Sequence, residues 1–139
     1  SKNRVKVVHT NTAGTALGAV GSFGAPQGTD TVWSSASSAA GGGLDVAYSV
    51  TSRSAINVWH THVLRTLSVD GPKTASRGSS VTFTVSDAGD PVAGAKVTFG
   101  GRSATTNAQG KATLRASGGN GVRAAKAGYN TGTTAVRVR

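Results

Sequence analysis

Three observations predict an all-β protein, in which residues 66–139 form a β-sandwich and residues 1–65 form an irregular β region or an extended arm. Valine, threonine, serine, alanine and glycine dominate the 139 residues, and 20 of them are glycine. This composition suits short strands joined by tight turns. Turn signals recur every roughly 8–12 residues in the second half, which is typical of a sandwich. No stretch has the apolar period of an amphipathic helix.

The first half alternates strand-like runs with stretches of small residues. Residues 11–30 show little periodicity and many glycines, so we interpret them as a surface loop, as part of a first β unit, or as an extended arm that orders on a partner. Residues 35–43, with the sequence SASSAAGGG, are interpreted as a loop or flexible linker. Runs rich in β-branched and aromatic residues predict strands at residues 4–10, 31–35, 44–52 and 55–69.

The second half is more regular. Its strand candidates alternate apolar and polar residues, as half-buried strands do. The turn signals between them include Asp90-Pro91, Gly100-Gly101 and Gln109-Gly110. The residues predicted to point into the core are Val81, Phe83, Val85, Ala95, Val97, Phe99, Ala112, Leu114, Val136 and Val138.

The segment VTFTVSDAGDPVAGAKVTFGGRSATTNAQGKATLRA (81–116) resembles bacterial immunoglobulin-like domains of the invasin/intimin type. Carboxypeptidase regulatory-like domains share the same turn pattern. The resemblance covers about residues 66–139, and it implies an immunoglobulin-like β-sandwich that serves as a non-catalytic spacer, adhesive or docking module on secreted bacterial proteins. The loop before Thr105 is shorter than in many such domains, and the first half lacks the pattern. The matching residues are Asp87, Pro91, Val92, Gly94, Ala95, Val97, Phe99, Thr105, Gly110, Ala112 and Thr113.

The chain is strongly basic. Fifteen lysines and arginines face five aspartates, which gives a formal net charge of +10. Such a charge attracts polyanions, although the basic residues are spread along the chain and also suit a solvated surface. A basic sheet face would make the chain a binding module for an anionic glycan or cell-wall polymer. Nucleic acid is not favoured, because aromatic residues are not interleaved with the basic ones. The candidate residues are Lys96, Arg102, Arg115, Arg123 and Arg137.

The sequence VWHTHV (58–63) is the sharpest local motif. On a strand, His60 and His62 point to the same face, as metal ligands do. A zinc site needs further ligands, and the spacing selects none among His9 and the five aspartates. A metal-site fragment around the two histidines is therefore the third hypothesis, beside the simpler interpretation of two histidines on a solvated strand. The sequence predicts no metal and no cofactor.

The sequence DAGD (87–90) could suggest a calcium loop. Calcium takes about six or more oxygen ligands, which Asp87 and Asp90 with two small residues between them do not supply. We therefore interpret the two acids as turn residues that bond the backbone of their own turn. There is no Gly-x-Ser-x-Gly elbow, no cysteine and no glutamate, so the sequence does not predict an enzyme.

The leading hypothesis is a non-catalytic, secreted or cell-surface bacterial module that docks into a larger protein assembly. The sandwich would act as a rigid scaffold and the first half as the contact surface, with strand addition by the 11–30 arm as one route. No stretch approaches the roughly 20 apolar residues of a membrane-spanning helix. The large aromatic residues of the first half are the candidate anchors for the partner protein: Phe23, Trp33, Tyr48 and Trp59.

Overall fold

A computed structural model describes residues 4–24, 31–38, 43–52 and 55–139. Within these ranges the chain is built from strands and turns without a helix, which confirms the predicted all-β class. The first strands are β1 (Arg4–Thr10), β2 (Leu17–Gly24), β3 (Thr31–Ser38), β4 (Gly43–Ser52) and β5 (Ala55–Thr66). The later strands are β6 (Ser68–Asp70), β7 (Thr74–Ala75), β8 (Ser80–Asp87), β9 (Asp90–Pro91), β10 (Lys96–Phe99), β11 (Arg102–Thr105), β12 (Lys111–Arg115), β13 (Gly121–Ala125), β14 (Tyr129–Asn130), β15 (Gly132–Ala135) and β16 (Arg137–Val138).

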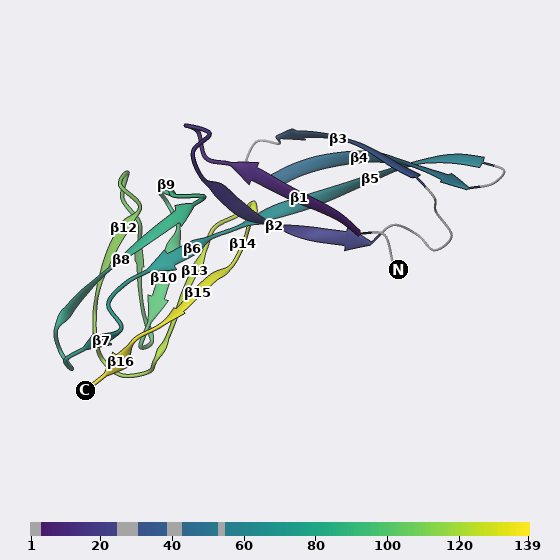
Figure 1. The fold of residues 1–139 in the computed structure, drawn as a ribbon. Coiled ribbons are helices and arrows are strands. Elements are labelled where there is room, and N and C mark those ends of the chain that lie inside the picture. Colours follow the sequence, from purple (N-terminus) through teal and green to yellow (C-terminus); the bar gives the residue numbers. More distant parts are fainter. Residues whose placement is uncertain (1–3, 25–30, 39–42, 53–54) are drawn as a thin grey trace.

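The first five strands form one sheet in the order β1-β2-β5-β4-β3, which we call the first sheet. Neighbouring strands among these five run antiparallel. The short strand β14 pairs with β5 in parallel. Strands β3, β4 and β5 keep an unbroken register, whereas the β1–β2 ladder shifts between Lys6 and Val8. In Figure 1 the β3, β4 and β5 strands extend away from the part of the chain that ends at the C-terminus.

The first sheet is more regular than the sequence suggested. Residues 17–24 form β2, which agrees with the alternative of a first β unit and not with a loop or arm. Strand β3 continues to Ser38, inside the stretch that was interpreted as a linker. Residues 25–30 and 39–42 lie outside the described part. Serine, glycine and alanine have weak strand preferences, but pairing with β1 or β4 satisfies the backbone groups of these segments and makes them strands.

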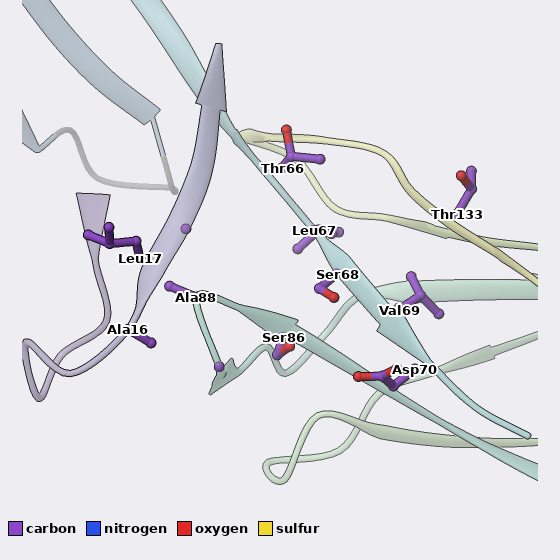
Figure 2. Close-up of a pocket in the computed structure, with 12 residues that line it drawn as sticks. Ala16, Leu17, Thr66, Leu67, Ser68, Val69, Asp70, Ser86, Ala88 and Thr133 are labelled. Atoms are coloured by element: carbon purple, nitrogen blue, oxygen red, sulfur yellow. The ribbon is translucent and has the colours of Figure 1, made fainter. Parts of the chain in front are cut away.

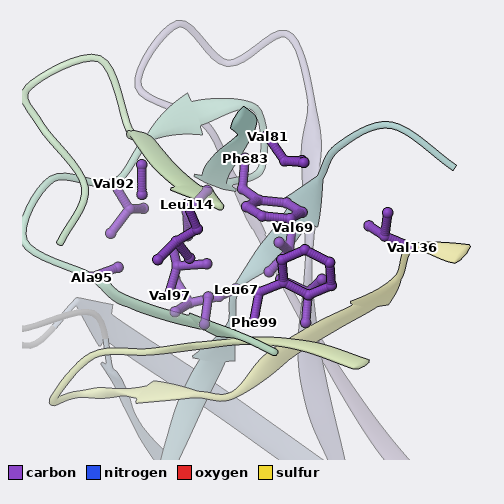
Figure 3. Close-up of a cluster of buried hydrophobic side chains, with 14 of the residues drawn as sticks. Leu67, Val69, Val81, Phe83, Val92, Ala95, Val97, Phe99, Leu114 and Val136 are labelled. Atoms are coloured by element: carbon purple, nitrogen blue, oxygen red, sulfur yellow. The ribbon is translucent and has the colours of Figure 1, made fainter. Parts of the chain in front are cut away.

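Residues 67–138 form two facing sheets. One has the order β12-β8-β6, with β9 on β8, and the other has the order β11-β10-β13-β15. A parallel pair, β16 with β7, completes this region. The inner faces meet around Phe83 and Phe99, whose rings pack edge to face with centroids 5.4 Å apart (Figure 3).

The core of the sandwich matches the predicted inward residues. All of them are buried except Val138, which is partly buried and packs against the cluster. Alternation in the sequence predicts burial here because both sheets are covered on one face only. The cluster contains Leu67, Val69, Val81, Phe83, Val85, Val92, Ala95, Val97, Phe99, Ala112, Leu114, Ala116, Val122, Ala124 and Val136.

The chain passes from the first sheet to the sandwich without a linker. Strand β5 ends at Thr66, and the next residue, Leu67, already belongs to the sandwich core. Asn130 fastens this crossing, because its backbone carbonyl accepts from the Leu67 N–H at 3.1 Å and its side chain donates to the Leu64 carbonyl at 3.0 Å. Within the described ranges, no helix has the length and apolar character needed to cross a membrane.

Candidate binding surfaces and the junction that positions them

A buried polar cluster joins the β1–β2 hairpin and β5 to the sandwich. Asp87, at the end of β8, is almost fully buried; its Oδ1 lies 2.6 Å from Nε2 of His9, and its Oδ2 accepts from Nη1 of Arg65 at 3.2 Å. The exposed fractions of these side chains are 6% for Asp87, 8% for His9 and 22% for Arg65. A buried carboxylate needs such partners, so the three residues form one structural unit, which we call the junction cluster.

Gly18 makes room for this cluster. It lies opposite His9 in the β1–β2 ladder, and a Cβ atom at position 18 would overlap the His9 ring. The imidazole therefore lies across the backbone of β2 on its way to Asp87. Sequence inspection gave no reason to single out Gly18 among many glycines, because the reason is a contact across the ladder.

A second acid holds the turn of the same hairpin. Thr12 donates to Oδ2 of Asp90 from its hydroxyl and from its backbone N–H, at 2.7 Å in each case. These two hydrogen bonds, the side-chain one first, hold the pKa of Asp90 below its usual value. Asn11 shapes the turn by accepting from the N–H of Thr15 at 2.7 Å.

The interpretation of Asp87 and Asp90 as acids that bond their own turn was therefore wrong. The turn forms without their help: Ala88 and Gly89 both have positive φ, 52° and 94°, as a type I′ hairpin turn requires. The carboxylates are left free to bind His9 and Thr12, each 78 residues away in sequence.

A cleft of about 590 Å³ lies beside the junction, between the start of β2 and the sandwich. Figure 2 shows Leu17 on the hairpin side, with Ser68 and Asp70 of β6 on the sandwich side. Small residues and hydroxyls make up most of its walls, and Asp70 is the one charged residue among the described residues that line it.

The two histidines of the VWHTHV motif do share a face of β5, as predicted. Oδ1 of Asp45, on β4, lies 2.8 Å from Nδ1 of His62 and 3.3 Å from Nε2 of His60. The hydrogen bond from His62 is the main reason that the pKa of Asp45 is lowered. Strand pairing thus selects the acid that spacing could not, since Asp45 is opposite His62. Among the described residues, no three such side chains are arranged to hold a metal ion.

The same face of β5 carries two exposed branched residues. Ile56 is 72% exposed and Val58 is 77% exposed, and they alternate along β5 in phase with His60 and His62. We call these four residues the β5 outer face. The opposite face is the covered one, since Val46 of β4 is 1% exposed there.

The structure places the four predicted aromatic anchors by backbone only; their side chains lie outside the described part. Tyr48 and Trp59 are direct partners in the β4–β5 ladder. Trp33 pairs with Ser49 and so occupies the alternate row of the same sheet. Phe23 lies on β2, in the β1–β2 hairpin on the other side of β5. The register therefore brings two of the four together.

The five basic candidates do not gather on one face. Lys96 and Arg123 lie in the same outward row of β10 and β13, and both are exposed. Arg115 is on β12, in the outward row of the opposite sheet. Arg102 and Arg137 begin the short strands β11 and β16. The largest grouping of these candidates on one sheet face is thus the pair Lys96 and Arg123.

Comparison of the chain with protein-family models, curated proteins and solved structures finds no match. Sequence inspection missed the junction cluster, which positions the first sheet on the sandwich, although one signal was present. Asp87 continues the inward row of Val81, Phe83 and Val85 on β8. An acid in a buried row needs a partner, and that alone predicts a contact from elsewhere in the chain.

Proposed function

We propose that this chain is a non-catalytic structural or adaptor module, secreted by or displayed on a bacterium, that docks into a larger protein assembly. The sandwich acts as the scaffold, and the first sheet presents the contact surface. The observation that carries the proposal is the exposed pair Ile56 and Val58 on the β5 outer face.

The strand order of residues 67–138 supports an immunoglobulin-like scaffold. In the immunoglobulin nomenclature, β12-β8-β6 corresponds to strands E, B and A, and β11-β10-β13-β15 corresponds to C′, C, F and G. This arrangement agrees with the resemblance of residues 81–116. It is one reason to propose a display module, because such sandwiches serve widely as rigid supports for binding surfaces.

The composition of the β5 outer face supports docking to a protein. Exposed apolar residues scattered singly are normal, but here two branched side chains occupy consecutive positions of one row. His60 and His62 extend the row with polar groups, which resembles the apolar centre and polar rim of protein interfaces.

The junction cluster also supports the proposal, because it holds the contact surface in place before a partner binds. A surface that is ordered before binding loses less conformational entropy when a partner arrives. Strand β5 runs directly into the sandwich, and the junction cluster ties both β5 and the hairpin to β8. The β5 outer face is therefore held by a scaffold with its own hydrophobic core.

The test is a pull-down from culture of the source bacterium with the purified chain as bait, followed by mass spectrometry. We expect one protein to co-purify in stoichiometric amount. Replacing Ile56 and Val58 together by serine should lower its recovery by about tenfold or more, as for a hot spot of at least 1.4 kcal/mol.

The matched control replaces Val8 and Leu17 by serine, since they are similarly exposed, at 61% and 70%, but lie on the hairpin. Equal recovery with both double variants, or a bait that captures nothing, would contradict the proposal.

A second candidate function is binding of an anionic glycan or cell-wall polymer, and the position of Lys96 and Arg123 in one outward row of β10 and β13 favours it. Binding to an anionic polysaccharide column should then weaken steeply with salt. Changing both residues to glutamine should lower the eluting salt concentration more than changing Arg115 and Lys111, which lie on the opposite sheet. Equal shifts would show a response to net charge only.

A further inference from the structure

Strand β3 is an outer strand of the first sheet. It pairs with β4 over its full length, from Thr31 opposite Thr51 to Ser38 opposite Leu44. Among the described residues, β4 is its one ladder partner. An outer strand presents a row of backbone N–H and C=O groups to which another strand can add.

The sequence of β3 lacks the features that usually protect such an edge. Natural proteins blunt outer strands with charged residues, proline or bulges. Strand β3 reads TVWSSASS and has no charge, no proline and no register shift. The other outer strand of this sheet, β1, carries Arg4 and Lys6 and has a register shift beside Lys6. The β1 edge therefore has features that discourage the addition of another strand, whereas the β3 edge has none of them.

The distribution of charge along the chain allows a second copy of this chain to occupy the β3 edge. The chain carries +10, so two copies repel one another wherever their basic surfaces meet. Asp45 and Arg65 are the two charged residues within β3, β4 and β5. Ten of the fifteen lysines and arginines lie beyond residue 66. The β3 edge is thus where two copies can approach with least repulsion.

We propose that β3 pairs with β3 of a second copy, antiparallel and about a two-fold axis, so that the two first sheets become one continuous sheet. Antiparallel pairing of identical strands is self-complementary, since each donor of one copy faces an acceptor of the other. It also closes the assembly, because the protected β1 edge does not extend it into a filament. The dimer uses an edge of the sheet and not the β5 outer face, so it stands independently of the proposed docking.

The first test is the oligomeric state of the purified full chain, by analytical ultracentrifugation over a range of concentrations. We expect a monomer–dimer equilibrium that shifts toward the dimer as salt screens the repulsion between two +10 chains. Replacing Ser35 and Ser37 by lysine should raise the dissociation constant by at least about tenfold. The control makes the same change at Ser103 and Thr105 of β11, an outer strand of the sandwich, and should leave it unchanged.

The second test uses the absence of cysteine from the chain. Single cysteines placed in turn at Ser34, Ser35, Ser37 and Ser38 should form disulfide-linked dimers most readily at one position and less on either side of it. Antiparallel strands bring only the residues near the two-fold axis within the short Cβ separation that a disulfide needs. The control variant Ser103→Cys should form no disulfide-linked dimer.

Three outcomes would overturn the proposal. They are a monomer at every concentration, lysine variants of β3 that dimerise as well as the unaltered chain, and cross-linking that is uniform along β3, which indicates a parallel pair. Circular dichroism of each variant shows whether it still folds; if the lysine variants unfold, the cysteine scan alone decides.

Discussion

In the sandwich, fifteen buried hydrophobic residues meet between two sheets, whereas Val46 is the one hydrophobic residue described as buried before Leu67. The first sheet has longer strands, and its register is unbroken through β3, β4 and β5. Polar contacts nevertheless contribute much of what holds this sheet to the sandwich. Regular strands alone therefore do not make an independent folding unit. A sheet needs a second layer to bury its apolar face, so we expect the sandwich to support the first sheet and not the reverse.

The most disruptive change should be Phe99→Ala, in the sandwich. Phe99 is fully buried against Phe83, and truncation leaves a cavity that should lower the free energy of unfolding by about 3–5 kcal/mol. Both regions should unfold together in denaturant, because the first sheet depends on the sandwich. Phe99→Leu, which retains more of the volume, should cost much less. A first sheet that stays folded after the sandwich has unfolded would contradict the dependence of the first sheet on the sandwich.

Asp87→Asn should disrupt the junction cluster between the first sheet and the sandwich, and should leave the sandwich folded. The change removes the charge that pairs Arg65 and contacts His9, and should cost about 3 kcal/mol, toward the low end for a buried pair because Arg65 is 22% exposed. Hydrogen exchange should become faster in β1 and β2 and stay slow in β8 and β10. Asp70→Asn, at an exposed acid of β6, is the control. Uniform loss of protection would show one cooperative unit.

Gly18→Ala should loosen the hairpin by a smaller amount. The new methyl group overlaps the His9 ring, and such overpacking costs about 1–3 kcal/mol. Adding His9→Ala removes the clash, so the two changes together should cost less than the sum of the single changes. Leu17→Ala, at the exposed neighbouring residue, should be close to neutral. Strict additivity would mean that the His9 ring does not lie over Gly18.

Thr12→Val should have the smallest effect, because its contact with Asp90 is exposed. Folding lowers the pKa of Asp90, so its stabilisation is present above the usual aspartate pKa and is lost as the pH falls through the lowered one. Without the Thr12 hydroxyl, the pKa of Asp90 should rise toward its usual value, which NMR titration of the carboxyl carbon would measure. Thr10→Val is the control, and an unchanged Asp90 pKa would rule out the contact.

Part of the candidate surface was visible in the sequence. The spacing of His60 and His62 already placed them on one face of a strand, and the register confirms it. The sequence did not predict that Asp45 contacts both histidines, or that Ile56 and Val58 are exposed. Both depend on which strand lies beside β5 and on which face is covered, and strand pairing between distant segments decides this.

The alternation of Val81, Phe83 and Val85, and of Val97 and Phe99, by itself determined the β-sandwich and most of its core. A period of two predicts burial wherever one face of a sheet is covered. The tertiary structure alone decided that Ser- and Gly-rich segments become β2 and β3, because backbone pairing outweighs weak side-chain preferences. It also decided that the partner of Asp87 is His9, 78 residues away, since no local pattern identifies which distant segment supplies that partner.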